Sequence, residues 1–383
     1  MREANSSETR EQKAIDTTLD QRPNASLRGR RKRAATTANF RSHRNGPISP
    51  SREQPARGLL SVIGAINWDI SIFEDRFARP GEEVPVRLVE EFSGGKGANV
   101  AVAAARVLGP RRVAFLGALG DDYLWSRQLT ELRKEGVITD GMMRVERARS
   151  GRAYILVDAD GRKTIHTHFG ANDRISPHHL IRGVAASFIS KTHTMIVMDP
   201  PTPVALTAAQ SAASKGAKVI YSPGVRTQEG RPRLERVLEH SDYLVVDRLE
   251  LMNMYQTRSE EEAFEQIKQS DSSLTVVATL GARGCVVARD GIMTPVGGID
   301  LSAIGKKPVN TTGSGDAFLG VFASYLAMGY GPLEATNWAN LAGALKATRY
   351  ETRGSPRKDE LERMMKRVER FKLAQLGLEE RVF

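Results

Sequence analysis

Short apolar segments alternate with helix-forming segments along most of this chain. The segments predicted as strands are nearly continuous apolar runs at residues 59–66, 112–117, 195–198, 217–221, 242–246 and 274–279. Strands that are apolar on both faces are typical of a parallel sheet buried between two layers of helices. The alternation therefore predicts an α/β fold, a three-layer αβα sandwich with a mostly parallel central sheet.

Two parts of the chain interrupt this alternation. Residues 70–92 and 142–168 contain strand-like pieces joined by turn-forming residues such as Pro80-Gly81 and Asp160-Gly161. Pieces of this kind form antiparallel hairpins. We expect a small β-sheet that projects from the main domain and serves as a lid over a site, or as the contact of a homodimer.

Polar residues follow the predicted strands directly. They are Asp69, Asp199, Asp247, Glu250, Thr279, Gly281 and Asp316. In open α/β sheets, ligands bind beyond the carboxyl ends of the strands. We therefore expect these residues to meet in one cleft.

The stretch Asn310-Thr311-Thr312-Gly313-Ser314-Gly315-Asp316-Ala317-Phe318 has the composition of an anion-binding loop. Three small residues, Gly313, Ser314 and Gly315, precede Asp316, and an apolar helix-forming run follows. Loop amides and the positive end of a helix bind anions, and the aspartate is a candidate general base. The alternative is an ordinary glycine-rich turn that Asp316 caps.

A second glycine-rich stretch, Gly94-Gly95-Lys96-Gly97-Ala98-Asn99, leads into an Ala/Val-rich segment predicted to be helical over 100–108. Glycines let the backbone approach a ligand closely, and Lys96 and Asn99 can hydrogen-bond hydroxyl groups. It is not a Walker A loop, because no Ser or Thr follows the lysine.

The net charge of +11 lies mostly at the start of the chain. Residues 1–57 contain 13 Lys/Arg and 6 Asp/Glu, which leaves +4 for the remainder. This polar segment is expected to be a disordered tail. Its basic run, 28–33, has a composition that can contact nucleic acid, but we favour a solvated extension. The globular part is expected to span 58–373, followed by a tail over 374–383.

Several classes of protein are excluded. No run of 18 or more apolar residues exists, so no transmembrane helix or membrane partner is expected. The single cysteine, Cys285, excludes internal disulfides and suits a reducing compartment, so a cytoplasmic location is expected. The seven histidines show no metal-ligand spacing.

Together the two glycine stretches resemble the signatures of the ribokinase family, also called the PfkB family of carbohydrate kinases. The early signature corresponds to Gly94–Asn99 and the late one to Asn310–Phe318. The resemblance covers about residues 59–370. It implies an ATP-dependent carbohydrate kinase that uses ATP and Mg²⁺, with a monovalent cation such as K⁺ as a further cofactor.

The resemblance also implies roles for individual residues. Asp316 resembles the catalytic base, and Gly313, Ser314 and Gly315 resemble the anion hole. Residues implied to bind the sugar are Asn67, Asp69, Gly95, Lys96, Asn99 and Asp199. Those implied to bind ATP are Asp247, Thr279, Gly281, Gly284, Gly315 and Asn340. Glu250 would hold Mg²⁺ through water, and Asn310 a monovalent cation.

The chain departs from the family pattern at three of these places. Asp247 stands where Asn is usual, which adds negative charge near the phosphates. Asn310 stands where ribokinases have an Asp that helps hold the monovalent cation, and Ala282 replaces a Ser of the phosphate loop. We expect the γ-phosphate of ATP to pass to a primary hydroxyl of a sugar. Two alternatives stay open, a nucleoside kinase of the same family and a non-catalytic ligand-binding regulator.

Overall fold

The computed structural model describes residues 58–270 and 273–375. The predicted N-terminal tail and residues 376–383 of the predicted C-terminal tail lie outside the described residues. Within the part of the chain that the structure describes, no helix is both long and apolar enough to cross a membrane.

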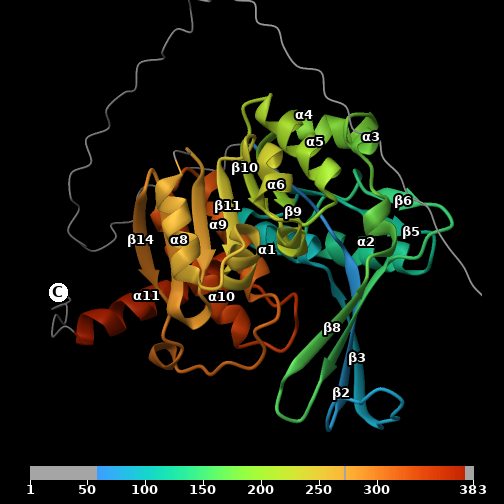
Figure 1. Cartoon of the computed structure of the whole chain (residues 1–383), viewed down its shortest axis with the longest axis horizontal. Helices are drawn as coiled ribbons and strands as arrows, with labels where there is room; N and C mark the ends of the chain where they lie inside the picture. The colour runs from blue at the N-terminus through green and yellow to red at the C-terminus, as the bar shows by residue number, and fades with distance from the viewer. Residues whose placement is uncertain (1–57, 271–272, 376–383) are drawn as a thin grey trace, which may run out of the picture. The chain divides into compact units, whose positions relative to one another are not determined.

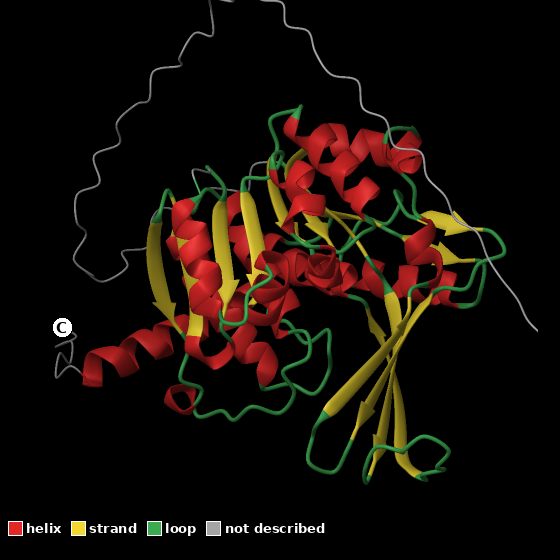
Figure 2. Ribbon diagram, in the orientation of Figure 1, coloured by secondary structure: helices red, strands yellow, loops and turns green. Residues whose placement is uncertain are grey.

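An eight-stranded sheet forms the middle layer of the main domain (Figure 2). Its strands are β1 (Leu59–Gly64), β4 (Val113–Leu116), β9 (Thr192–Met198), β10 (Lys218–Ser222), β11 (Tyr243–Asp247), β12 (Thr275–Thr279), β13 (Gly284–Arg289) and β14 (Ile292–Gly297). They lie in the order β14-β13-β12-β11-β10-β9-β1-β4, and only the pairs that involve β13 are antiparallel. The predicted mostly parallel sheet is confirmed.

Helices cover both faces of this sheet (Figure 1). On one face lie α1 (Lys96–Leu108), α9 (Ser314–Ala327), α10 (Pro332–Ala347) and α11 (Lys358–Gln375). On the other lie α3 (Pro177–Leu180), α4 (Gly183–Lys191), α5 (Thr202–Ala213), α6 (Arg231–Leu238), α7 (Arg248–Tyr255) and α8 (Glu260–Gln269). The three-layer αβα architecture is therefore confirmed.

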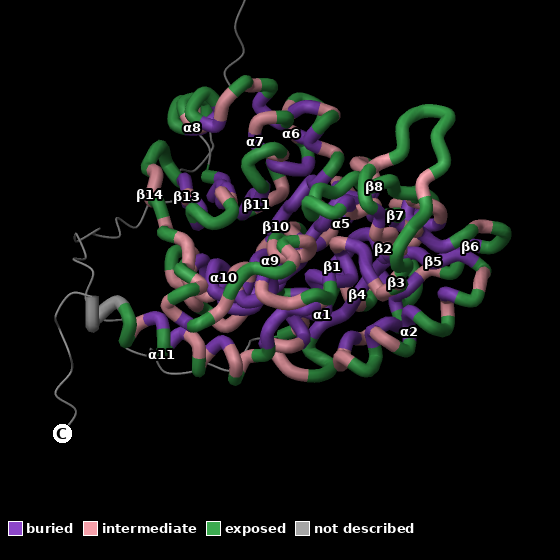
Figure 3. The backbone as a smooth tube through the Cα atoms, turned by 90° about the horizontal axis from the view of Figure 1, so that it is seen from below, coloured by how far each residue is buried: buried purple, intermediate pink, exposed green. Residues whose placement is uncertain are grey.

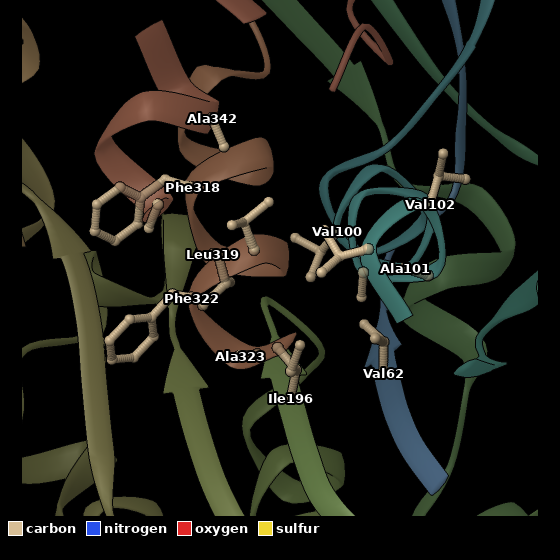
Figure 4. Close-up of a cluster of buried hydrophobic side chains, with 14 of the residues drawn as sticks. Val62, Val100, Ala101, Val102, Ile196, Phe318, Leu319, Phe322, Ala323 and Ala342 are labelled. Carbon is tan, nitrogen blue, oxygen red and sulfur yellow. The ribbon is translucent and has the colours of Figure 1, made fainter. Parts of the chain in front are cut away.

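The strands supply alternate side chains to two cores because successive side chains of a strand point to opposite faces. Val62 of β1 and Ile196 of β9 pack under α1 and α9, whereas Ile63 and Val197 pack under the helices of the other face. Figure 4 shows the first of these cores, where Leu319 of α9 lies among the side chains of α1 and the sheet. The buried segments in Figure 3 include β1 and β10 along most of their length.

A second, four-stranded sheet projects from the main domain (Figure 1). Its strands are β2 (Asn67–Glu74), β3 (Val86–Gly94), β7 (Gly151–Val157) and β8 (Lys163–His168), in the order β3-β2-β7-β8. The predicted second sheet is thus confirmed. Between the two sheets the chain also forms α2 (Leu124–Lys134) and the short pair β5 (Ala118–Gly120) and β6 (Met143–Val145).

Two predicted boundaries were wrong. The strand predicted over residues 59–66 ends at Gly64, and Asn67 and Asp69, which were predicted to follow it directly, lie on β2 of the small sheet. An apolar run alone cannot show where a chain leaves one sheet for another. The helix predicted over 100–108 begins already at Lys96, and its first turn lies so close to β1 that a Cβ at Gly97 would be 2.7 Å from Gly64 Cα.

Candidate active site

Two cavities meet where α9 begins. The first has a volume of about 290 Å³ and lies between the small sheet and the main sheet. The second, of about 260 Å³, lies between β13, α9 and α10. Thr279, Gly315 and Phe318 line both cavities, so a ligand in one can reach a ligand in the other at this point.

The first cavity is lined by the predicted sugar-binding residues. Those residues are Asn67, Asp69, Gly95, Lys96, Asn99, Asp199 and Asp316, and the predicted phosphate-side residues Asp247 and Glu250 join them. The small sheet positions Asn67 and Asp69 on β2, whereas the helices α1, α7 and α9 carry most of the others. The small sheet adds apolar side chains, among them Ile155 and Ile165.

The second cavity is lined by predicted ATP-binding residues. They are Thr279, Gly281, Gly284, Gly315 and Asn340, together with Ser314 of the predicted anion hole. Asn340 of α10 donates to the Gly297 carbonyl at 3.2 Å, which ties the end of β14 to the cavity wall. Much of the remaining lining is apolar or glycine, a surface that suits a planar ring.

The loop before α9 depends on a glycine at one position. Gly313 precedes the helix with φ of 85°, in the left-handed region, and a Cβ there would lie 2.2 Å from the Thr352 carbonyl oxygen. Gly315, by contrast, faces open space. Since the first amides of a helix lack intrahelical partners, the start of α9 presents N–H donors where the two cavities meet.

Asp316 lies at this junction in the first turn of α9, with only 8% of its surface exposed. The Asn99 amide donates to Asp316 Oδ2 at 2.8 Å. Arg353 in turn donates to Asn99 Oδ1 at 3.1 Å and to the Gly94 carbonyl at 3.0 Å. This chain of hydrogen bonds fixes the carboxylate and leaves Oδ1 free to face the first cavity.

Three carboxyl groups of the first cavity, those of Asp69, Asp199 and Asp316, have raised pKa values. Burial raises the pKa of Asp316, although the Asn99 hydrogen bond and the Lys96 charge oppose the increase. Burial raises the pKa of Asp69 to about 7 against the opposing Arg353 charge. Burial also raises the pKa of Asp199 to about 7, opposed by Lys96 and Arg226. Such values suit groups that exchange protons near neutral pH.

Lys96 and α7 form the opposite wall. Lys96 Nζ lies 3.2 Å from Glu250 Oε1. Burial opposes the charge of Lys96, but Glu250, Asp199 and Asp316 together raise its pKa above the ordinary value. Asp247 caps α7, because its side chain accepts from the Glu250 amide at 2.8 Å and the Glu250 side chain accepts from the Asp247 amide. Asp and Asn cap helices equally well, which gives a physical reason why Asp stands here.

Asn310 is the one predicted site residue that lines neither cavity in the described part of the chain. Its side-chain oxygen accepts from Lys163 Nζ at 2.9 Å and from the Thr312 amide at 3.0 Å. Its carbonyl oxygen accepts from Lys346 Nζ at 2.8 Å. Two ammonium groups therefore surround the residue that the sequence assigns to a monovalent cation.

Some residues that shape the site escaped the sequence analysis. Asn172 holds the Asn67 side chain at 2.9 Å, and Arg353 holds Asn99. Lys163 of β8 reaches the loop before α9, where it donates to Thr312 Oγ1 at 2.6 Å. None of them belongs to a motif, and Arg353 stands in a run of charged residues that resembles an ordinary surface segment.

Each cavity holds a buried polar atom without a hydrogen-bond partner among the described residues. In the first cavity this atom is Asp199 Oδ1, and in the second it is Ser314 Oγ. A buried polar atom without a partner costs free energy, so such atoms are expected where a polar ligand supplies the partner. Trp68, which could stack on a nucleoside base, instead packs under Arg127 at 4.1 Å and lies outside both cavities.

Comparisons with known proteins agree with this geometry. Residues 57–359 match the sequence model of the pfkB family carbohydrate kinases. The chain is 29% identical to a ribokinase of Bacillus subtilis over 313 residues, which cover 80% of this chain and 99% of the relative.

Among solved structures, a ribokinase from Thermotoga maritima has a TM-score of 0.70 and 26% identity, covering 81% of this chain and 99% of its own. A ribokinase from Arabidopsis thaliana, solved with ribose and ATP, has a TM-score of 0.69 and 22% identity. The alignment covers 81% of this chain and 98% of the Arabidopsis chain, and at this identity the similarity shows a shared fold.

Proposed function

The chain belongs to the pfkB family of carbohydrate kinases, and from this premise we propose that it transfers the γ-phosphate of ATP to a primary hydroxyl group of a sugar. One observation carries the proposal. A polar cavity and a glycine-lined cavity meet at the start of α9, with the Asp316 carboxylate at their junction. A sugar in the first cavity and ATP in the second would place acceptor hydroxyl and γ-phosphate side by side.

Asp316 then acts as the general base. It accepts the proton of the sugar hydroxyl while the oxygen attacks the γ-phosphorus, and the bond from that phosphorus to the β–γ bridging oxygen breaks. The products are ADP, a sugar phosphate and the proton held on Asp316. The amides at the start of α9 and the Lys96 ammonium stabilise the charge on the transferring group.

Mg²⁺ would be held mainly by phosphate oxygens and water. Among the described residues, no group of three or more Asp, Glu, His or Cys side chains is placed to hold a metal ion. Both oxygens of Glu250 already accept hydrogen bonds, from Lys96 and from the Asp247 amide. Magnesium commonly keeps several waters and binds through substrate phosphates, so Glu250 fits an outer position that contacts these waters.

The charges of the first cavity favour a neutral sugar over a sugar phosphate. Three buried carboxyl groups, Asp69, Asp199 and Asp316, line this cavity, and Lys96 is the one cationic side chain among its described lining residues. Carboxylates accept hydrogen bonds from hydroxyl groups but repel a second phosphate. The apolar surface of Ile155, Ile165 and Phe169 also offers room for a nucleoside base, so nucleosides remain the second candidate acceptors.

An acceptor panel tests the proposal. The full chain is incubated with ATP and Mg²⁺, and ADP release is measured with ribose, fructose, sugar phosphates and nucleosides. We expect a free sugar to give the highest kcat/KM, and the product to carry phosphate on its primary hydroxyl by ³¹P NMR. A nucleoside as the best acceptor would support the second candidate.

The same panel separates the enzyme from a non-catalytic regulator. ADP release without a phosphorylated product would indicate ATP hydrolysis rather than transfer. Ligand binding by calorimetry without phosphorylation of any acceptor would overturn the kinase proposal for this chain.

A further inference from the structure

Lys346 is a fully buried lysine with neutral partners. It lies in the last turn of α10 with 0% of its surface exposed. Its Nζ donates to the carbonyl oxygen of Asn310 at 2.8 Å and to that of Arg349 at 3.4 Å. Lysine is almost never fully buried unless its charge is compensated. Among the described residues no carboxylate forms an ion pair with it, although the Asp316 and Glu351 charges act on it from farther away, and its hydrogen bonds go to backbone carbonyls.

This arrangement resembles the coordination of an alkali cation. A desolvated monovalent cation such as K⁺ takes carbonyl oxygens in place of its hydration shell. Here a single positive charge lies against carbonyl oxygens from two segments, the loop before α9 and the end of α10. The charge is covalently attached, so it cannot dissociate.

The Lys346 ammonium is coupled to the anion-binding loop. Val309 and Asn310 donate their amides to the Ala347 carbonyl at 2.7 and 3.0 Å, which holds this segment against the end of α10. Asn310 Oδ1 then accepts from the Thr312 amide, one residue before Gly313. The position of the first α9 amides therefore depends on the segment that Lys346 holds.

The surrounding charges disfavour an additional cation. Lys163 contributes a second ammonium at Asn310 Oδ1. Residue 310 is a neutral amide, where the family resemblance predicts a carboxylate that would attract a cation. Burial first, and then the Lys163 charge, lower the pKa of Lys346 to about 8, although the Asp316 and Glu351 charges oppose the decrease. The residues present do not fit a dissociable monovalent cation at Asn310.

We propose that the Lys346 ammonium takes the place of the monovalent cation beneath the anion-binding loop, so that this kinase needs no K⁺. Lys346 is a positioning residue, since it acts through Asn310 and does not line either cavity. The catalytic part of this inference rests on the proposed function, whereas its cation-binding part does not.

The test compares the full chain in KCl and in choline chloride at equal ionic strength. We expect the wild-type kcat to differ by less than about twofold between the two salts. Lys346→Ala removes the ammonium and leaves space for a cation, so its kcat in choline should fall and KCl should restore it by about tenfold. Lys346→Met fills the same space without charge, and is the matched control that KCl should not restore.

Thermal unfolding supplies a readout that needs no catalysis. The midpoint of Lys346→Ala should rise with K⁺ relative to choline, because a ligand that binds only the native state stabilises it. Wild type and Lys346→Met should show no such specific rise. If the wild type phosphorylates no acceptor, the proposed function fails while this measurement still decides the inference.

Two results would overturn the proposal that the Lys346 ammonium takes the place of the monovalent cation. One is a strong activation or a K⁺-specific stabilisation of the wild type. The other is a Lys346→Ala variant that responds to K⁺ no more than Lys346→Met does. Asn310→Asp combined with Lys346→Ala should strengthen the response further, because it adds a carboxylate on the residue whose carbonyl the ammonium contacted.

Discussion

Asp316, Asp69 and Asp199 are buried in this site, although carboxyl groups ordinarily lie at the protein surface. Three carboxyl groups lie in a cavity where burial favours their protonated forms. Stability alone would favour neutral side chains at these positions. In the proposed reaction their negative charge would accept sugar hydroxyls and the transferred proton. The site therefore retains carboxyl groups that lower the free energy of unfolding when no ligand is bound.

Asp316→Asn tests the base directly. Asn keeps the shape of the side chain and can still accept the Asn99 hydrogen bond, but it cannot take a proton. We expect kcat to fall by about 10²–10⁴-fold, the usual contribution of a general base. The sugar dissociation constant, measured by calorimetry, should change little. Near wild-type turnover would contradict the assignment.

Asp199→Asn tests the cost of a buried carboxylate. The folded-state pKa of Asp199 lies near 7, above its ordinary value of 3.8. The folded state therefore binds the proton more tightly, and the stability from this group is present at low pH and lost as pH rises through about 7. At pH 8 the free energy of unfolding of the variant should exceed that of the wild type by on the order of 1 kcal/mol, and the difference should be smaller at pH 5.

Urea titrations of wild type and variant at both pH values measure this difference. The variant should also lose sugar affinity, since Asp199 lines the first cavity and its buried Oδ1 accepts no hydrogen bond from a described residue, although Arg226 Nε lies 3.7 Å from it. A stability difference that does not depend on pH would count against a raised pKa at Asp199.

At the scale of elements, the small sheet and α9 both contribute side chains to the first cavity. Lys163, at the start of β8, links them through its contacts with Asn310 and Thr312. The rest of β8 is exposed, so few apolar contacts hold this strand in place. Elements with few buried contacts are those that open and close around ligands.

Lys163→Met should loosen the small sheet. The variant loses two hydrogen bonds between β8 and the loop before α9, and we expect the KM for the sugar to rise by about fivefold, equivalent to about 1 kcal/mol. The thermal midpoint should hardly change because the residue is exposed. Arg162→Met is the matched control, since Arg162 bonds only within its own hairpin, to Asp158 and Asp160. An equal rise of KM in both variants would refute the role of Lys163 in linking β8 to the loop before α9.

At the scale of the whole molecule, every residue that lines the two cavities lies between Ala65 and Thr352. The family match over residues 57–359 covers the same part of the chain. All described residues that line the cavities therefore come from this part of the chain.

A variant that lacks residues 1–57 is expected to keep kcat and both KM values within about twofold of the full chain. Steady-state kinetics of the two forms on the same acceptor measure this. A large loss of kcat in a variant that retains its thermal midpoint would show that the segment takes part in catalysis.

The small sheet also bears an apolar face directed away from the first cavity. Ile72, Val89 and Leu156 lie side by side on it, and Val89 is 49% exposed. We expect the chain to form a homodimer through this face, and Val89→Lys to shift sedimentation towards the monomer. Ile292→Lys, on the edge strand β14, replaces an even more exposed apolar residue elsewhere and should have no effect. A wild-type monomer at all concentrations would contradict the prediction.

The sequence by itself determined the layers of this protein and the loop at its centre. The apolar runs predicted the parallel strands because periodicity is a local property. Gly313 and Asp316 could be assigned because a left-handed residue followed by a helix start is encoded within a few residues. The boundaries at Gly64 and Lys96 could not be predicted, because they depend on contacts between separate elements.

Only the tertiary structure decided which residues support the site. Arg353 holds Asn99 across 254 positions of the chain, and Lys163 reaches Asn310 across 147. Lys346 donates to Asn310 across 36 positions, and its burial distinguishes it from an ordinary lysine near a helix end. Such contacts depend on how the strands are ordered and how helices pack on them, and no local pattern in the sequence specifies that arrangement.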